Sequence, residues 1–337
     1  MKNLIFLMMV FFTQSLWAEA GLYTSDTRSL QQISEMNSIL EKITQENPQK
    51  NILIYVHGRN KYIEKEWDKL SVLEETYNIK VVMFHWDAWS SVLTRAVANA
   101  EAAADPLNET FKEVQEFKES HQDFFRDHKI SLLCHSMGNL VLKFFTEKIL
   151  LRGEYSLEVP LFDNFMGVSP DVPLLDHRLW LSRFNLASKK FIMMNNRDSV
   201  LLMSYALDLK DKNPYGYRLG LAFDNAPGKR DQIKSKLVSD VSYIDLSAVL
   251  QSEHGYFMPK TPILKTIFSK LTRGEKFDFS SMNKDNFKIK INWIFIFFII
   301  LFFFMMMIIF FFIILFMFVM MIIFFFIFFI ILFMFMM

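Results

Sequence analysis

A series of short apolar runs, each followed by a polar turn, constrains the fold of this chain more than any other feature. The runs cover residues 51–56, 80–84, 130–134, 162–168, 190–194 and 241–246, and stretches of helical pattern lie between them, notably residues 95–120 and 140–151. Continuous apolar runs are typical of strands buried on both faces, which helices join into parallel sheets. The pattern predicts one α/β domain over residues 21–285, with a mostly parallel central sheet flanked by helices.

The composition of the chain argues against several classes of function. The formal net charge is +1, and basic and acidic residues are interspersed, so we expect no nucleic-acid partner. The spacing of histidines and cysteine matches no metal motif, and we expect neither a metal nor a cofactor. The single cysteine, Cys134, cannot form an internal disulfide and lies in an apolar run, so we expect it to be buried.

The N-terminus has the pattern of a secretory signal peptide over residues 1–20. Lys2 precedes an apolar run at residues 4–12, and small residues follow, with Ala18 and Ala20 as alternative cleavage positions. The run is shorter than the roughly 20 residues of a spanning helix, although an uncleaved anchor or a buried helix is the alternative. We therefore expect export to the periplasm or the medium.

The C-terminal residues 292–337 form an apolar, low-complexity tail. From residue 294 onward the tail contains only Phe, Ile, Met, Leu and one Val. Its length suits a membrane anchor, but it lacks the small residues that pack spanning helices together. Lys284, Lys288 and Lys290 precede it, and the positive-inside tendency would keep the domain in the cytoplasm, against the signal peptide. Two interpretations stay open: a membrane segment, or translated T-rich DNA beyond the true end of the gene.

Residues 133–138 read Leu-Cys-His-Ser-Met-Gly, a version of the G-x-S-x-G motif in which a strand turns sharply into a helix. The turn strains the serine backbone, and the positions two before and two after the serine must be small. Gly138 meets this requirement fully and Cys134 acceptably. The motif makes Ser136 the candidate nucleophile, with an ordinary strand-to-helix turn as the alternative.

The same turn suggests a site that stabilises an oxyanion. The backbone N–H of Met137 would lie at a helix N-terminus, where the partial positive charge favours an anion. We expect a second N–H from the loop after residues 51–56, where Gly58 lets the backbone approach a substrate. Arg59 is the candidate for this second donor.

Chain order then selects the remaining candidates, because this kind of serine site requires nucleophile, acid and histidine in that order. Among the histidines, His254 alone follows the final strand, and it would act as the general base. Asp198 follows the strand at residues 190–194 and would orient His254. Asp171, one strand earlier, is the alternative acid. Asp87 also ends a strand, but its order is wrong, and we interpret it as structural.

These residues resemble the α/β-hydrolase superfamily, and more narrowly its poorly characterised bacterial lipase-like and esterase-like members. The matching segments are residues 56–58, 135–139, 169–171, 196–198 and 254–257, in that order. The resemblance covers roughly residues 50–260, and it implies a mostly parallel sheet of about eight strands and hydrolysis of an ester or related acyl bond. It supplies no substrate, because this scaffold hosts many reactions.

The preferred function is therefore cleavage of a carboxylic ester, of a lipid or another apolar acyl group, through an acyl-enzyme on Ser136. Acyl transfer or thioester hydrolysis would use the same residues. A catalytically silent protein that keeps the fold is the alternative from another class. Apolar residues between 174 and 184 are expected either in a core helix or in an acyl pocket. A membrane partner is possible through the tail, and the oligomeric state is not predicted.

Overall fold

The computed structural model describes residues 20–91, 93–153, 155, 159–210, 216–221, 237–258, 261–275 and 320. The chain divides into two units, residues 1–284 and 285–337, and the following description concerns the first. The predicted signal peptide and the apolar tail lie outside the described residues, apart from residues 20 and 320. Within the described ranges, no helix has both the length and the apolar character that a membrane crossing requires.

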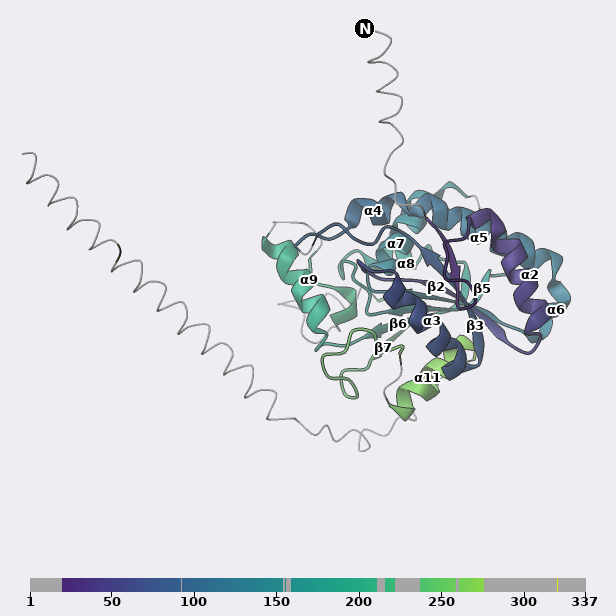
Figure 1. Ribbon diagram of the computed structural model, residues 1–337. Coiled ribbons are helices and arrows are strands. Elements are labelled where there is room, and N and C mark those ends of the chain that lie inside the picture. Colours follow the sequence, from purple (N-terminus) through teal and green to yellow (C-terminus); the bar gives the residue numbers. More distant parts are fainter. Residues whose placement is uncertain are drawn as a thin grey trace, which may run out of the picture. The chain divides into compact units, whose positions relative to one another are not determined.

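A seven-stranded sheet forms the centre of the described fold (Figure 1). β1 pairs antiparallel with β3, and the other neighbouring strands run parallel in the order β1-β3-β2-β4-β5-β6-β7. The strands are β1 (Gly21–Thr24), β2 (Asn51–Val56), β3 (Ile79–His85), β4 (Ile130–His135), β5 (Phe162–Val168), β6 (Ala187–Met194) and β7 (Val241–Asp245). The predicted fold class, a mostly parallel sheet flanked by helices, is confirmed.

Helices connect these strands and cover both faces of the sheet (Figure 1). The α-helices are α2 (Met36–Glu46), α3 (Glu64–Tyr77), α4 (Val97–Ala102), α5 (Ala104–Ser120), α6 (Gln122–Asp127), α7 (Gly138–Lys148), α8 (His177–Leu181), α9 (Ser199–Lys210) and α11 (Pro262–Thr272). Short 3-10 helices are η1 (Ile33–Glu35), η2 (Leu150–Arg152) and η3 (Leu219–Leu221).

Strand β2 shows why the apolar runs are continuous. Ile52 and Ile54 belong to the core beneath α2, α5 and α7, whereas Leu53 and Tyr55 belong to the core beneath α3 and α11. Figure 1 shows these two sets of helices on opposite sides of the sheet. Both faces of the strand are therefore buried, and neither can carry the polar residues of a half-exposed strand.

Two elements differ from the sequence prediction. β1 was not predicted, because its four residues are too few to establish a period, yet all four are buried. The predicted helix at residues 95–120 is divided into α4 and α5. Pro106 has no backbone N–H, so a helix tolerates it in the first turn, and α5 starts at Ala104.

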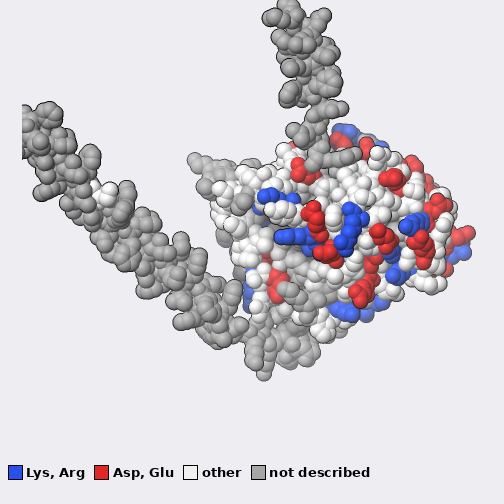
Figure 2. All heavy atoms as spheres, viewed as in Figure 1, with Lys and Arg blue, Asp and Glu red and all other residues white. Residues whose placement is uncertain are grey.

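Charged side chains are mixed on the face of the molecule that Figure 2 displays. Lys and Arg alternate with Asp and Glu there, and neither sign forms an extended field on this face. This distribution agrees with the interspersed charges of the sequence.

Candidate active site

Ser136 lies in the turn between strand β4 and helix α7. Its φ is 53°, in the left-handed region that residues other than glycine seldom adopt. Strand β4 ends at His135 and α7 begins at Gly138, so Ser136 and Met137 alone make the turn. The strained strand-to-helix turn that the motif predicts is therefore present.

Hydrogen bonds hold the backbone of Ser136 in this conformation. The Ser136 carbonyl accepts from the backbone N–H of Asn139 at 3.1 Å, from Asn139 Nδ2 at 3.2 Å and from the N–H of Asp171 at 3.2 Å. The Ser136 N–H donates to the carbonyl of Val168 at 3.0 Å. The turn is thus fixed from its own helix and from the neighbouring strand β5, which offsets the backbone strain.

Close approach of the backbone explains the two glycines near Ser136. A Cβ on Gly138 would lie 2.5 Å from the carbonyl oxygen of Val56, so a larger residue would push α7 away from β2. A Cβ on Gly58 would lie 2.7 Å from the Cβ of Ser136. The loop after β2 therefore passes directly beside the serine.

Cys134 occupies the position of the first glycine in the motif. It is fully buried, as predicted, and burial raises the pKa of its thiol well above the ordinary value. Its partner in β5 is Gly167, where a Cβ would lie 2.8 Å from Oδ1 of Asn139. Space for α7 at this position therefore comes from Gly167, and the thiol is a small core side chain.

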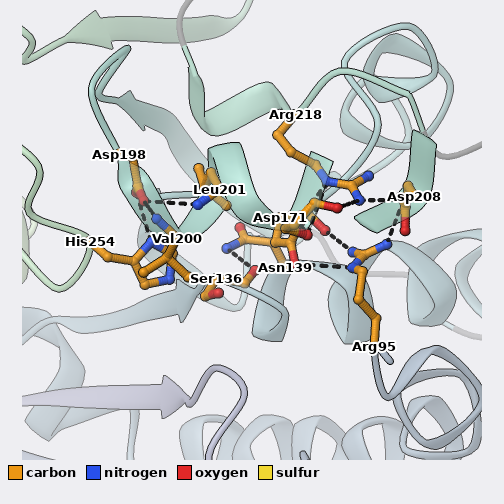
Figure 3. A network of polar contacts seen from close by, with 11 residues as sticks. Arg95, Ser136, Asn139, Asp171, Asp198, Val200, Leu201, Asp208, Arg218 and His254 are labelled. Carbon is orange, nitrogen blue, oxygen red and sulfur yellow. Dashed lines mark hydrogen bonds and ion pairs between the residues drawn. The ribbon is translucent and has the colours of Figure 1, made fainter. Parts of the chain in front are cut away.

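The side chains of His254 and Asp198 form a hydrogen bond (Figure 3). His254 Nδ1 lies 2.7 Å from Asp198 Oδ2, and the carboxylate is completely buried. Asp198 Oδ1 accepts from the backbone N–H groups of Val200 and Leu201, both at 3.0 Å, at the start of α9. The carboxylate is therefore held from one side by a helix N-terminus and directed with its other oxygen at the imidazole.

The loop that carries His254 is attached beside Ser136. The carbonyl of His254 accepts from Oγ of Ser169 at 2.8 Å, and Nε2 of His135 lies 3.3 Å from the same oxygen. The rings of His135 and His254 are 4.7 Å apart. Because His135 directly precedes Ser136, these contacts hold the loop of His254 against the end of β4 that leads into the serine turn. Figure 3 draws His254 and Ser136 in the same part of the view.

Asp171, the alternative acid, belongs to a buried network of ion pairs (Figure 3). Its carboxylate pairs with Arg95 at 3.2 Å and with Arg218 at 2.8 Å, and it accepts from the hydroxyl of Ser204 at 2.8 Å. Both arginines also pair with Asp208 on α9. Asp198 therefore contacts His254, whereas the carboxylate of Asp171 pairs with the two arginines.

The charges around Asp171 keep it ionised. Burial alone would raise the pKa of this carboxyl, but Arg95 and Arg218 together with the hydrogen bond from Ser204 bring it below its ordinary value. Neither arginine belongs to a sequence motif, so the sequence carried no signal for this network. The backbone N–H of Asp171 meanwhile supports the Ser136 carbonyl, so the network adjoins the serine turn.

The two candidate oxyanion donors belong to the serine turn and to the loop after β2. Met137 is the residue immediately before α7, at the positive end of the helix dipole. Arg59 follows Gly58, which approaches Ser136. The Arg59 guanidinium stacks 4.7 Å from the centre of the Trp89 ring and donates to the carbonyl of Ser91, so contacts with the loop after β3 hold the side chain.

Beneath this loop lies a pair of stacked histidines. His57 Nε2 is 3.1 Å from His85 Nδ1, and the ring centroids are 5.2 Å apart. Burial lowers the pKa of His85 to about 3, and the neighbouring His57 acts in the same direction. Burial also lowers the pKa of His57. The pair is therefore neutral at physiological pH and supports the loop without adding charge.

Other candidate residues are structural in their contacts. Asp87 Oδ2 accepts from Asn99 Nδ2 at 3.0 Å, in agreement with the structural interpretation. Between residues 174 and 184, Trp180, Leu181 and Phe184 are buried in the core, which favours the core-helix alternative for this segment. Within the described ranges, no group of three or more His, Cys, Asp or Glu side chains could hold a metal ion.

A cavity of about 120 Å³ adjoins His254. Its lining is mixed: Val249, Leu250, Met258 and Leu264 are apolar, whereas Glu253, His254 and Thr261 are polar.

The fold and the arrangement of Ser136, Asp198 and His254 define a protein of the α/β-hydrolase class. Residues 32–270 match a family model described as "Alpha/beta hydrolase of unknown function (DUF900)", and the chain belongs to this family. No curated protein matches the sequence.

Several solved structures are similar to this chain. A hyperthermophilic esterase from the archaeon Pyrobaculum calidifontis is 13% identical, with a TM-score of 0.34, over 66% of this chain and 75% of that one. A predicted CIB-like hydrolase from Thermoplasma acidophilum is 14% identical, with a TM-score of 0.38, over 67% and 88% of the two chains. Lipase B from Aspergillus fumigatus is 14% identical, with a TM-score of 0.39, over 71% of this chain and 56% of that one.

Proposed function

We propose that this protein is a serine hydrolase that cleaves carboxylic esters through an acyl-enzyme on Ser136. The observation that carries the proposal is the hydrogen bond between Asp198 and His254 beside a serine with left-handed backbone geometry. A serine becomes a useful nucleophile when an adjacent base, itself oriented by a third group, can accept its proton.

In the proposed reaction, Ser136 Oγ attacks the ester carbonyl carbon while Nε2 of His254 takes the hydroxyl proton. The protonated His254 then gives this proton to the leaving alkoxide, and the acyl group remains on Ser136. A water molecule, deprotonated by His254, attacks the acyl-enzyme and releases the carboxylic acid, and the proton returns to Ser136. Asp198 fixes the tautomer of His254 and stabilises the imidazolium without taking up the proton.

The oxyanion that forms on the ester carbonyl would be stabilised by the backbone N–H groups of Met137 and Arg59. Donors that are already in position cost no reorganisation when the charge develops. The position of Met137 before α7 and the approach of Gly58 to Ser136 support this assignment.

The proposed substrate is an apolar acyl ester, and the apolar side chains of Val249, Leu250, Met258 and Leu264 beside His254 support this choice. Acyl transfer and thioester hydrolysis proceed through the same acyl-enzyme, and only the acceptor or the leaving group would differ. Export and attachment to a membrane also belong to the proposal. Only the sequence patterns of residues 1–20 and 292–337 support them.

Hydrolysis of a series of p-nitrophenyl esters tests the proposal. We expect turnover by the full chain and its loss in both Ser136→Ala and His254→Ala. The dependence on acyl chain length would define the pocket. Turnover that persists in both variants would contradict the serine mechanism. A folded parent without turnover would favour the catalytically silent alternative.

A further inference from the structure

Asn195 joins the turn of the candidate acid to the loop of the candidate base. It follows strand β6 and is fully buried. Its Nδ2 donates to the carbonyls of Gln251 and Glu253, both at 2.9 Å. These carbonyls belong to the loop that carries His254.

The side-chain oxygen and the backbone carbonyl of Asn195 face the turn of the acid. Its Oδ1 accepts from the N–H of Arg197 at 3.1 Å, and its backbone carbonyl accepts from the N–H of Asp198 at 3.1 Å. One side chain thus connects the Asp198 turn and the His254 loop.

This pattern of two donated hydrogen bonds and one accepted hydrogen bond requires the side-chain amide of asparagine. The position needs two N–H donors for two carbonyls and one acceptor for an N–H, all on a short planar group. Aspartate offers no donor when ionised, and alanine offers neither donors nor acceptor. Losing the amide would leave buried carbonyls without a partner, and the loop would move to satisfy them.

We propose that Asn195 is a positioning residue that sets the distance between Asp198 and His254. The proposal rests on the proposed function of the same site. Asp198 and His254 are 56 positions apart in the chain and meet through loops, so their 2.7 Å contact depends on how those loops are held together. Residues that orient a reacting group in this way commonly change activity by about 10- to 100-fold when they are removed.

The test compares Asn195→Ala with the matched control Asn164→Ala in the full chain. Asn164 is also fully buried, and its Nδ2 also donates to two carbonyls, those of Leu271 at 2.7 Å and Glu275 at 3.3 Å. These contacts are made with α11 and with the turn after it, three residues beyond its end, away from Ser136. Both variants should lose similar stability against urea, so a difference in activity between them would not come from stability.

Two readouts are measured, the kinetic constants for a p-nitrophenyl ester and the low-field proton NMR resonance of the Asp198–His254 hydrogen bond. For Asn195→Ala we expect kcat to fall about 10- to 100-fold with KM unchanged, and the resonance to broaden or disappear. For Asn164→Ala we expect both to match the parent. A parent-like kcat and resonance in Asn195→Ala, or equal kinetic losses in the two variants, would overturn the proposal.

Asn195→Asp preserves the size of the side chain. If Asn195→Ala does not fold, this variant tests whether the amide of Asn195 positions His254. The ionised carboxylate of this variant would place an oxygen against the carbonyls of Gln251 and Glu253, where the parent has an N–H donor. We therefore expect the resonance of the Asp198–His254 hydrogen bond to be absent at neutral pH. Acidification should restore it in part, because a protonated carboxyl can donate one hydrogen bond. A resonance that is independent of pH would count against the proposal. If the parent shows no ester turnover, the proposed function fails, and the NMR comparison still decides whether Asn195 positions His254.

Discussion

Asp198 Oδ2 lies 2.7 Å from Nδ1 of His254, and the carboxylate that makes this contact is completely excluded from solvent. The second oxygen of the same carboxylate is taken up by two backbone N–H groups of α9. Oδ2 of Asp198 is therefore left to bond with the imidazole of His254. His254 in turn is held next to Ser136 by Ser169 and His135.

Replacement of Asp198 by Asn should reduce kcat for ester hydrolysis by about 10³- to 10⁴-fold. The amide can donate toward Nδ1, which favours the tautomer of His254 that cannot accept the serine proton. Steady-state kinetics with a p-nitrophenyl ester measures the effect. Asp245→Asn is a suitable control, because Asp245 contacts Ser247 at the end of β7. A kcat within tenfold of the parent would show that Asp198 does not orient the base.

Replacement of Arg218 by Met should lower the free energy of unfolding by about 3–5 kcal/mol, because it removes one of the two arginines that pair with the buried carboxylates of Asp171 and Asp208. Arg218 is fully buried and pairs with both Asp171 and Asp208. Urea denaturation measures the change. Arg126→Met is the control, because the Arg126–Asp123 pair is exposed, with side-chain exposures of 75% and 92%, and should contribute little. Equal changes in the two variants would argue against a strong contribution from the buried network.

His85 should make stability depend on pH. Its pKa in the folded protein is lowered to about 3 from the ordinary 6.5. Between these values the unfolded chain binds a proton that the folded chain does not, so stability is full above pH 6.5 and falls as the pH falls toward 3. The slope from this one group is about 1.4 kcal/mol per pH unit at most. His85→Asn should reduce the slope in urea unfolding, and an unchanged slope would contradict the assignment.

The positions of β2 to β7 along the chain and the serine turn were predictable because both depend on local pattern. Apart from Asn51 and Ser131, residues 51–56 and 130–134 are apolar, because both faces of β2 and β4 are covered. The turn at Ser136 follows from small residues at fixed offsets, where Gly138 meets the backbone of Val56. Strand β1 escaped prediction because its four residues, which pair with β3 at positions 82–85, are too few to establish a period.

The choice between Asp198 and Asp171 could not be settled by sequence, because each follows a parallel strand. Arg95 distinguishes them, and it lies 76 residues before Asp171 in the chain. Arg218, which also pairs with Asp171, follows it in the chain and lies beyond α9. Contacts between distant segments leave no local pattern, so the ion-pair network and Asn195 appear only in three dimensions. The catalytic roles themselves stay predictions.

Labelling of the full chain by a fluorophosphonate tests the central claim most directly, because the reagent reacts with a serine that a neighbouring base has activated. The label should be located on Ser136 by peptide mass spectrometry and should be absent from Ser136→Ala. Labelling should also be much slower in His254→Ala. A folded parent that takes up no label, or a label on another residue, would contradict the assignment of Ser136 as the nucleophile.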